Sequence, residues 1–196
     1  VAEGSVYALS VGAVSDPGAD TRTGYSINWG DGTVQNHTPA EWTTAAGNFT
    51  HTYADGGAGG TARTVTVSAT DEDGTFVLGS KSLTVNNVAP LIALAGAGSI
   101  AEGASYTLTL GAVTDPGTET VTSYVVHWGD GNSDTYSAGG DVTHVYADGA
   151  ASPTITVDLV DEDGTHANAG AKSISVNNVA PTIALAVFWI VHILPE

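Results

Sequence analysis

An internal repeat constrains this chain more than any other feature. Four phrases of the first half return in the same order in the second half. They are "VGAVSDPG" at 11–18 and "LGAVTDPG" at 110–117, "INWGDG" at 27–32 and "VHWGDG" at 126–131, "HTYADG" at 51–56 and "HVYADG" at 144–149, and "TVTVSATDEDGT" at 64–75 and "TITVDLVDEDGT" at 154–165. A repeat of this length and order indicates two homologous modules.

The repeated phrases carry the alternation that is typical of β-strands. Apolar residues occupy every second position at 7–11 and 106–110, and again at 65–69 and 155–159. A period of two buries one face of each strand and exposes the other, as in antiparallel sheets packed as a sandwich. No segment shows a helical period of useful length. The sequence therefore predicts an all-β fold of two tandem immunoglobulin-like antiparallel β-sandwiches.

The phrase "VNNVAP" marks the expected module junction. It occurs at 85–90 and 176–181, and each copy is followed by one residue and "IAL". We expect module 1 at 1–88, module 2 at 89–179, and an unpaired first strand with an apolar tail at 180–196. Because Val1 aligns with Ile100, module 1 lacks the first strand that 89–100 supplies to module 2. The chain begins with valine and shows no signal peptide, so we expect a segment of a longer protein.

The charge and composition exclude several kinds of partner. The 196 residues carry a formal net charge of −17, with 21 acidic against four basic side chains. Such a surface repels nucleic acid and anionic membranes and suits hard cations such as Ca²⁺. No cysteine is present, and no apolar run reaches the ~20 residues of a membrane span. Because no catalytic motif appears either, we expect a protein that is not an enzyme.

The ordered motifs "WGDG", "HxYADG", "TVTVxxxDEDG" and "VNNVAP" resemble those of the PKD (polycystic kidney disease) domain and its bacterial PKD-like relatives. The resemblance covers both modules. It implies seven-stranded sandwiches strung in tandem in large secreted or surface-attached proteins, and hence an extracellular or cell-surface location.

Strand order brings several oxygen-bearing side chains of the second module to one end. The loops after the strands at 106–110 and 155–160 lie there, and the linker arrives at the same end. The expected cluster consists of Asn86, Asn87, Asp115, Glu119, Asp161 and Asp163. Six to eight oxygens of this kind suit a structural Ca²⁺ site. The alternative is that the Asp-Gly pairs are only turn formers.

The resemblance implies calcium ligands at Asn87, Asp115 and Asp161. The family loop usually has a second Asp soon after the first, and Gly117 stands near that position, with Glu119 as a substitute. Module 1 has the equivalents Asp16, Asp71 and Asp73. We expect its site to be weaker, because module 1 lacks a preceding linker.

Two function classes are compatible with these residues. The first is a non-catalytic structural repeat of an extracellular stalk, adhesin or filament, with neighbouring repeats or other copies as partners. The second is a carbohydrate-binding accessory module of a secreted enzyme, for which Trp42, in an insertion unique to module 1, is the candidate polysaccharide contact. The His and Tyr of "HxY" are interpreted as supports of a sheet corner, as in related sandwiches, and the Trp of "WGDG" as a core residue.

The two ends of the chain predict self-association. Residues 180–186 repeat a first strand, whereas module 1 has an open sheet edge that invites strand addition. We therefore expect the C-terminal strand of one chain to complete module 1 of the next, which would form head-to-tail filaments. The expected donor residues are Pro181, Ile183, Leu185, Val187 and Trp189. The alternatives are that the missing strand reflects where the sequence was cut, and that the tail 187–196 is an artefact or a capping strand.

Overall fold

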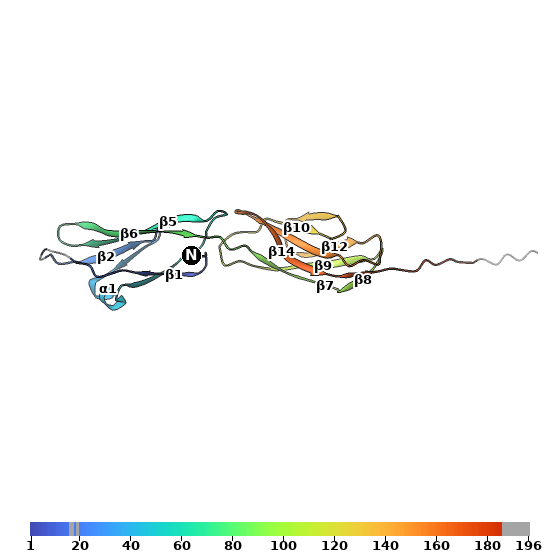
Figure 1. Cartoon of the computed structure of the whole chain (residues 1–196), viewed down its shortest axis with the longest axis horizontal. Helices are drawn as coiled ribbons and strands as arrows, with labels where there is room; N and C mark the ends of the chain where they lie inside the picture. Colours follow the sequence, from blue (N-terminus) through green and yellow to red (C-terminus); the bar gives the residue numbers. More distant parts are fainter. Residues whose placement is uncertain (16–17, 19, 186–196) are drawn as a thin grey trace, which may run out of the picture.

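The chain forms two β-sandwiches arranged end to end along one axis (Figure 1). The computed structural model describes residues 1–15, 18 and 20–185. Each sandwich has its own buried apolar cluster, one drawn from residues 9–85 and the other from residues 92–176. The predicted fold class is confirmed. Asp16, Val187 and Trp189 lie outside the described residues.

Module 1 is a sandwich of a small and a larger sheet. The small sheet pairs β1 (Val6–Ser10) with β4 (Asn48–Thr52). The larger sheet has the order β3-β2-β5-β6 and consists of β3 (Val34–His37), β2 (Gly24–Asn28), β5 (Thr61–Thr70) and β6 (Thr75–Val85). All pairs are antiparallel, as the alternation predicts.

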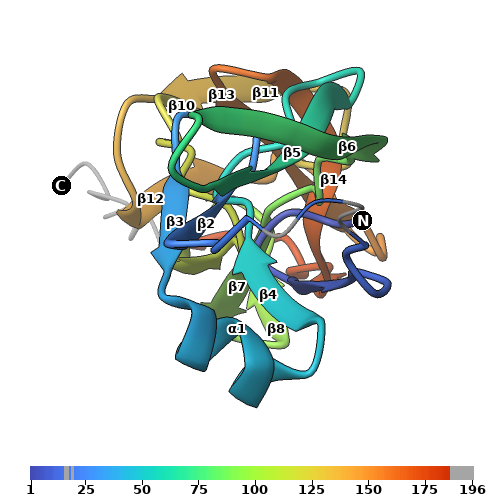
Figure 2. The same ribbon diagram turned by 90° about the vertical axis from the view of Figure 1, so that its left-hand side faces the viewer.

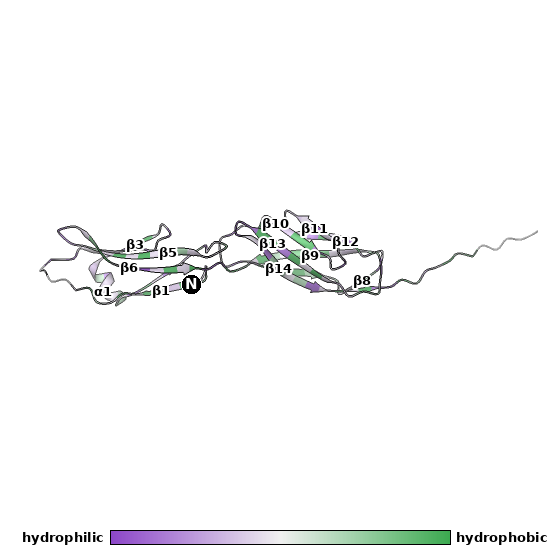
Figure 3. Cartoon of the chain, turned by 45° about the horizontal axis from the view of Figure 1, so that its top comes forward, coloured by the Kyte–Doolittle hydropathy of each residue, from purple (hydrophilic) through white to green (hydrophobic). Residues whose placement is uncertain are grey.

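Module 2 repeats this plan, and its smaller sheet gains a third strand, β7 (Leu91–Gly96). Its larger sheet has the order β11-β10-β13-β14, with β11 (Ser133–Tyr136), β10 (Ser123–His127), β13 (Thr154–Asp161) and β14 (Gly164–Ser173). Its other sheet has the order β12-β9-β7, with β12 (Gly140–Val145), β9 (Ser105–Thr114) and β7 (Leu91–Gly96). Polar and apolar residues alternate along these strands (Figure 3), and every second residue of β13 is buried.

The last strand of each module lies parallel to the segment that enters it. In module 2, β15 (Ser175–Asn177) pairs with β8 (Ser99–Ala101). In module 1, a single parallel bridge joins Ala2 to Asn86. Because the two segments run parallel, the chain leaves module 2 at the end opposite to the one where it enters (Figure 1).

The same aromatic motif holds both cores together. Trp29 and Trp128 are fully buried, and His51 and His144 stack on them with ring centroids 4.9 and 4.6 Å apart. The hydroxyl of the tyrosine two residues beyond each histidine donates to the carbonyl of the same tryptophan, at 3.0 Å in module 1 and 2.9 Å in module 2. The interpretation of the two tryptophans as core residues is confirmed.

A short helix was not expected from the sequence pattern. Helix α1 (Pro39–Ala45) stands between β3 and β4 at the margin of module 1 (Figure 2). It begins with a capping box in which the Thr38 hydroxyl accepts from the Glu41 amide and the Glu41 carboxylate accepts from the Thr38 amide. Seven residues are too few for a helical period, but "TPAE" itself is a helix-start signal.

The interpretation of Trp42 as an aromatic free to contact a ligand is wrong. Its side chain, carried by α1, is only 9% exposed. The ring stacks on Tyr25 with centroids 4.2 Å apart and packs against Phe49 at 4.5 Å. The helix packs Trp42 against the sheet, because burying an apolar ring is favourable relative to leaving it in water.

Candidate metal site at the module junction

Five carboxylates from both modules meet where the sandwiches adjoin. Module 1 contributes Glu3, ahead of β1, and Asp55, in the turn after β4. Module 2 contributes Asp115 and Glu119 from the loop after β9, and Asp163 from the β13–β14 turn. Oxygens of Glu3, Asp115 and Glu119 lie within 4.8 Å of one another, and so do oxygens of Asp55, Glu119 and Asp163. Glu119 therefore stands at the centre of the cluster, which we call the junction cluster.

The carboxylate of Glu119 is buried without a partner. Both of its oxygens are inaccessible, and neither accepts a hydrogen bond from another residue in the part of the chain that the structure describes. Burial raises the pKa of Glu119 to about 7; the charges of Glu3, Asp115 and Asp55 act in the same direction, whereas the residue's own amide opposes the rise. A buried carboxylate surrounded by other carboxylates requires a proton or a cation.

Glu119 occupies the space that a side chain at position 117 would use. A Cβ on Gly117 would overlap the Glu119 carboxylate. The Gly117 amide donates to Asp115 Oδ1 at 2.9 Å, which holds the loop in this conformation. A glutamate two residues further along thus brings its carboxylate to the place where an aspartate at 117 would stand.

Glu3 joins the linker to the body of module 1. Its side chain is buried, and its two oxygens accept from the amides of Gly56 and Val88, both at 2.7 Å. Module 2 repeats the arrangement, since Glu102 accepts from the amides of Gly149 and Val179. The modules also approach closely nearby, because a Cβ on Gly4 would overlap the backbone of Pro116.

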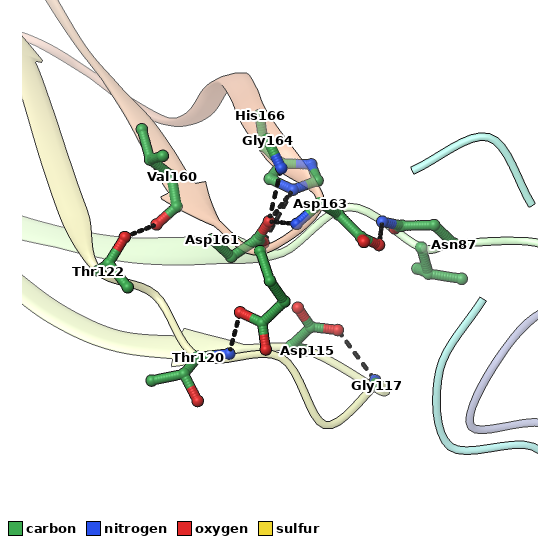
Figure 4. A network of polar contacts seen from close by, with 12 residues as sticks. Asn87, Asp115, Gly117, Thr120, Thr122, Val160, Asp161, Asp163, Gly164 and His166 are labelled. Atoms are coloured by element: carbon green, nitrogen blue, oxygen red, sulfur yellow. Dashed lines mark hydrogen bonds and ion pairs between the residues drawn. The ribbon is translucent and has the colours of Figure 1, made fainter. Parts of the chain in front are cut away.

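The linker contacts module 2 through the side-chain amide of Asn87. The side chain of Asn87 donates to Asp163 (Figure 4). Of the predicted residues, Glu119 lies close to both Asp115 and Asp163, and Asp163 contacts Asn87. Asn86 belongs to neither acidic group; its backbone pairs with the start of module 1, where the Asn86 amide donates to the Val1 carbonyl at 2.8 Å.

Asp161 makes its contacts within its own hairpin. Its side chain is 1% exposed, and Oδ1 accepts from the amides of Asp163 and Gly164 at 2.9 and 3.2 Å (Figure 4). The ring of His166 lies within 2.9 Å of both carboxylate oxygens. The geometry places Asp161 in the hairpin turn and outside both acidic groups, so the expectation that it surrounds the same spot is corrected.

Of the equivalent acids of module 1, Asp71 and Asp73 lie in the β5–β6 turn, at the end of that module away from module 2 (Figure 1). Asp71 Oδ1 accepts from the amides of Asp73 and Gly74 at 2.9 and 3.1 Å, as Asp161 does in module 2. Within the described residues, neither Asp71 nor Asp73 belongs to a group that could hold a metal. A weaker site at this end stays a prediction.

Sequence reasoning missed Glu3 and Asp55. Both lie in phrases that repeat, "AEG" at 2–4 and 101–103 and "YADG" at 53–56 and 146–149. The repetition was a signal, but "ADG" is also a common turn, and nothing local shows that the turn after β4 reaches the next module. Only the end-to-end arrangement brings these two acids to the loops of module 2.

Comparison with known proteins does not assign the chain to a family. No protein-family profile and no curated protein sequence matches the chain. A similar solved structure is that of the fibronectin(III)-like modules of Clostridium thermocellum CbhA, which are 15% identical, with 94% of this chain and 93% of that chain covered and a TM-score of 0.40.

A second similar structure contains three N-terminal domains of the highly immunogenic outer capsid protein (Hoc) of bacteriophage RB49. It is 14% identical, with a TM-score of 0.36, and covers 90% of this chain and 55% of that one. The chain thus spans about half the length of the phage structure. Neither likeness bears on function. In the described residues, no helix is long and apolar enough to cross a bilayer.

Proposed function

We propose that this chain is a non-catalytic structural segment of an extracellular stalk, adhesin or filament, built from PKD-like repeats whose junction is closed by Ca²⁺. The observation that carries the proposal is the junction cluster, in which both modules supply carboxylates around the buried, unpartnered carboxylate of Glu119. A cation bound there joins the two sandwiches and fixes the angle between them.

The electrostatics favour a divalent ion. Two like charges ~4 Å apart repel by about 4 kcal/mol at an effective dielectric constant of about 20, so an uncompensated cluster destabilises the junction. None of the ion pairs formed by the described residues includes one of the five carboxylates. Five carboxylates and the Asn87 amide offer enough oxygens for Ca²⁺, which takes six to eight ligands that include water.

The shape of the molecule supports a spacer role. The sandwiches follow one another along one axis, and the chain leaves module 2 at the end away from module 1 (Figure 1). Further modules added in the same way would lengthen the molecule along this axis, as in other repeat proteins whose modules contact only their neighbours. In the same role, head-to-tail addition of copies through the C-terminal segment would lengthen the filament.

The carbohydrate-binding alternative loses its main support. A sugar platform requires an exposed ring face, and Trp42 is covered by Tyr25 and Phe49. Trp42 and Arg22 both line a pocket of about 280 Å³, but Trp42 is only 9% exposed. We therefore favour the structural role.

The test is the response of the chain to calcium. Saturating Ca²⁺ raises the melting temperature by about 5 °C or more over the value in chelator, because the folded state alone binds the ion. X-ray scattering gives a narrower distribution of interdomain distances with Ca²⁺ than with chelator. Glu119→Gln abolishes both effects.

A matched control has the same change of charge outside the cluster. Glu41→Gln retains the full calcium response, because Glu41 lies on the exposed start of α1 and glutamine is also accepted in a capping box. Identical melting and scattering curves with Ca²⁺ and with chelator in the wild type would refute the proposal.

A further inference from the structure

Helix α1 forms one wall of a pocket in module 1. The pocket has a volume of about 280 Å³ and lies between three segments: residues 11–14 after β1, the chain around the start of β2, and the helix. Tyr25 and Trp42 line it, and their rings stack with centroids 4.2 Å apart. The Val11 amide donates to the Gly47 carbonyl at 2.7 Å, which joins two of the three segments beside the pocket.

Arg22 is the charged residue among the described residues that line this pocket. Its place in module 2 belongs to Val121. The amides on either side of Arg22, those of Thr21 and Thr23, make the same two hydrogen bonds as the amides on either side of Val121. Val121 packs against the apolar cluster of module 2. Module 1 therefore has a cation where its sister module has an apolar side chain, and it has this cation beside the helix that module 2 lacks.

One guanidinium nitrogen of Arg22 has no acceptor. Its Nη1 is inaccessible and makes no hydrogen bond in the part of the chain that the structure describes, and the ion pairs found there do not include Arg22. Glu41 of the helix is engaged, because its Oε2 accepts from both the amide and the hydroxyl of Thr38. Arginine keeps its proton in proteins, so a guanidinium nitrogen that is buried without a partner favours the binding of an anion.

The pocket suits a small monoanion with an apolar part. The planar guanidinium matches a carboxylate, which it binds through two parallel hydrogen bonds. The stacked rings of Tyr25 and Trp42 offer apolar contact beside this charge. The net charge of −17 repels a dianion such as a phosphate monoester more strongly than a carboxylate. The volume limits the ligand to a small molecule.

We propose that this pocket binds a small monocarboxylate, with Arg22 as its anchor. The carboxylate pairs with the guanidinium, and the apolar part of the ligand lies against Trp42 and Tyr25. This inference goes beyond the proposed structural role and needs no metal, since none of the five carboxylates of the junction cluster lines the pocket. It also differs from the polysaccharide alternative, because the anchor is a charge rather than an exposed ring face.

Titration of the full chain with benzoate tests the site. Isothermal titration calorimetry in chelator is expected to show saturable binding with a Kd of about 1 mM, the range of a ligand of this size. Benzyl alcohol has the ring without the charge and binds about tenfold or more weakly. Phenyl phosphate, a dianion, also binds more weakly than benzoate.

Two variants show whether the binding depends on this arginine. Arg22→Val installs the residue that module 2 carries at the same place, so the fold persists, and the affinity for benzoate falls by about tenfold or more. Its melting temperature without ligand stays the same or rises, because a partly buried, unpaired charge is removed. Arg63→Met is the matched control. Arg63 also has a buried guanidinium nitrogen without a partner among the described residues, but it does not line the pocket, so this variant keeps the benzoate affinity of the wild type.

Three results would overturn the inference. The first is a wild type that shows no benzoate binding up to about 20 mM. The second is an Arg22→Val variant that binds benzoate as tightly as the wild type does. The third is an affinity for benzyl alcohol or phenyl phosphate that equals or exceeds the affinity for benzoate. Because the titrations are made in chelator, their result is independent of the calcium response of the junction cluster.

Discussion

The carboxylate of Glu119 lies in the space that a side chain on Gly117 would fill. This relationship makes the glycine a requirement of the junction cluster rather than a simple turn residue. It also explains how the loop after β9 delivers two carboxylates, those of Asp115 and Glu119, to one place.

The first prediction is a rescue at this pair. Gly117→Ala displaces the flexible Glu119 side chain and reduces the calcium-induced rise in melting temperature, while the fold persists. Glu119→Gln abolishes the rise, and the double variant Gly117→Asp/Glu119→Gln restores at least half of it, because an aspartate at 117 returns a carboxylate to the same space. Differential scanning fluorimetry with Ca²⁺ and with chelator measures each response. No recovery in the double variant would contradict the substitution of one carboxylate for the other.

The second prediction concerns Glu3. Glu3→Ala leaves the amides of Gly56 and Val88 without their acceptor and lowers the free energy of unfolding of module 1 by about 2–4 kcal/mol. Urea denaturation in chelator measures this loss separately from metal binding. The matched change Glu102→Ala costs less, since Val179, one of its two donors, lies in an exposed segment. If Glu3→Ala and Glu102→Ala both lowered the free energy of unfolding by the same small amount, the role assigned to Glu3 would be contradicted.

The third prediction is that the contribution of Asp130 to the free energy of unfolding depends on pH. Burial tends to raise the pKa of Asp130, but hydrogen bonds from His144 and from the amide and side chain of Asn132 outweigh it and lower the pKa. A lowered pKa in the folded state stabilises the protein above the unfolded pKa of about 3.8, and this contribution is lost as the pH falls through the folded value.

The measurement compares the wild type with Asp130→Asn. At pH 6 the variant unfolds with a free energy lower by about 1 kcal/mol, because a charge-assisted hydrogen bond is replaced by a neutral one at a partly exposed site. The difference narrows below about pH 4 in urea titrations, as Asp130 of the folded wild type becomes protonated. A constant difference between pH 6 and pH 3 would contradict this assignment.

The fourth prediction concerns Trp42. Trp42→Ala lowers the free energy of unfolding of module 1 by about 3–5 kcal/mol, because it removes a ring that packs on both Tyr25 and Phe49. Trp42→Phe costs less, since it retains an aromatic ring in the same place. Affinity electrophoresis in a panel of polysaccharides shows the same mobility for the wild type and Trp42→Phe. Strong retardation of the wild type that Trp42→Phe abolishes would restore the carbohydrate-binding alternative.

The repeat and the period-two alternation were enough to predict two antiparallel sandwiches with Trp29 and Trp128 inside. Both signals are local or depend on comparing two halves of one sequence, and strand alternation fixes which side chains face the core. The proximity of Glu119 to Asp115 and Asp163 could also be predicted, because strand order determines which loops share an end of a sandwich. Helix α1 was missed, since its signal lies in the cap rather than in any period.

Only the tertiary structure decided which acids face one another across the junction. Glu3 and Asp55 belong to module 1 and are far in sequence from the loops that they meet, so no local pattern connects them. Asp161 and Asp163 are two residues apart in one turn, yet the first is held by the turn amides and His166 while the second reaches Asn87. The direction of each side chain depends on backbone geometry that a list of residues does not contain. The groove beside Gly79, between β1 and β6, could not be predicted from local sequence either. In the described part of the chain, it lies where the two sheets of module 1 face each other without the strand that fills this place in module 2.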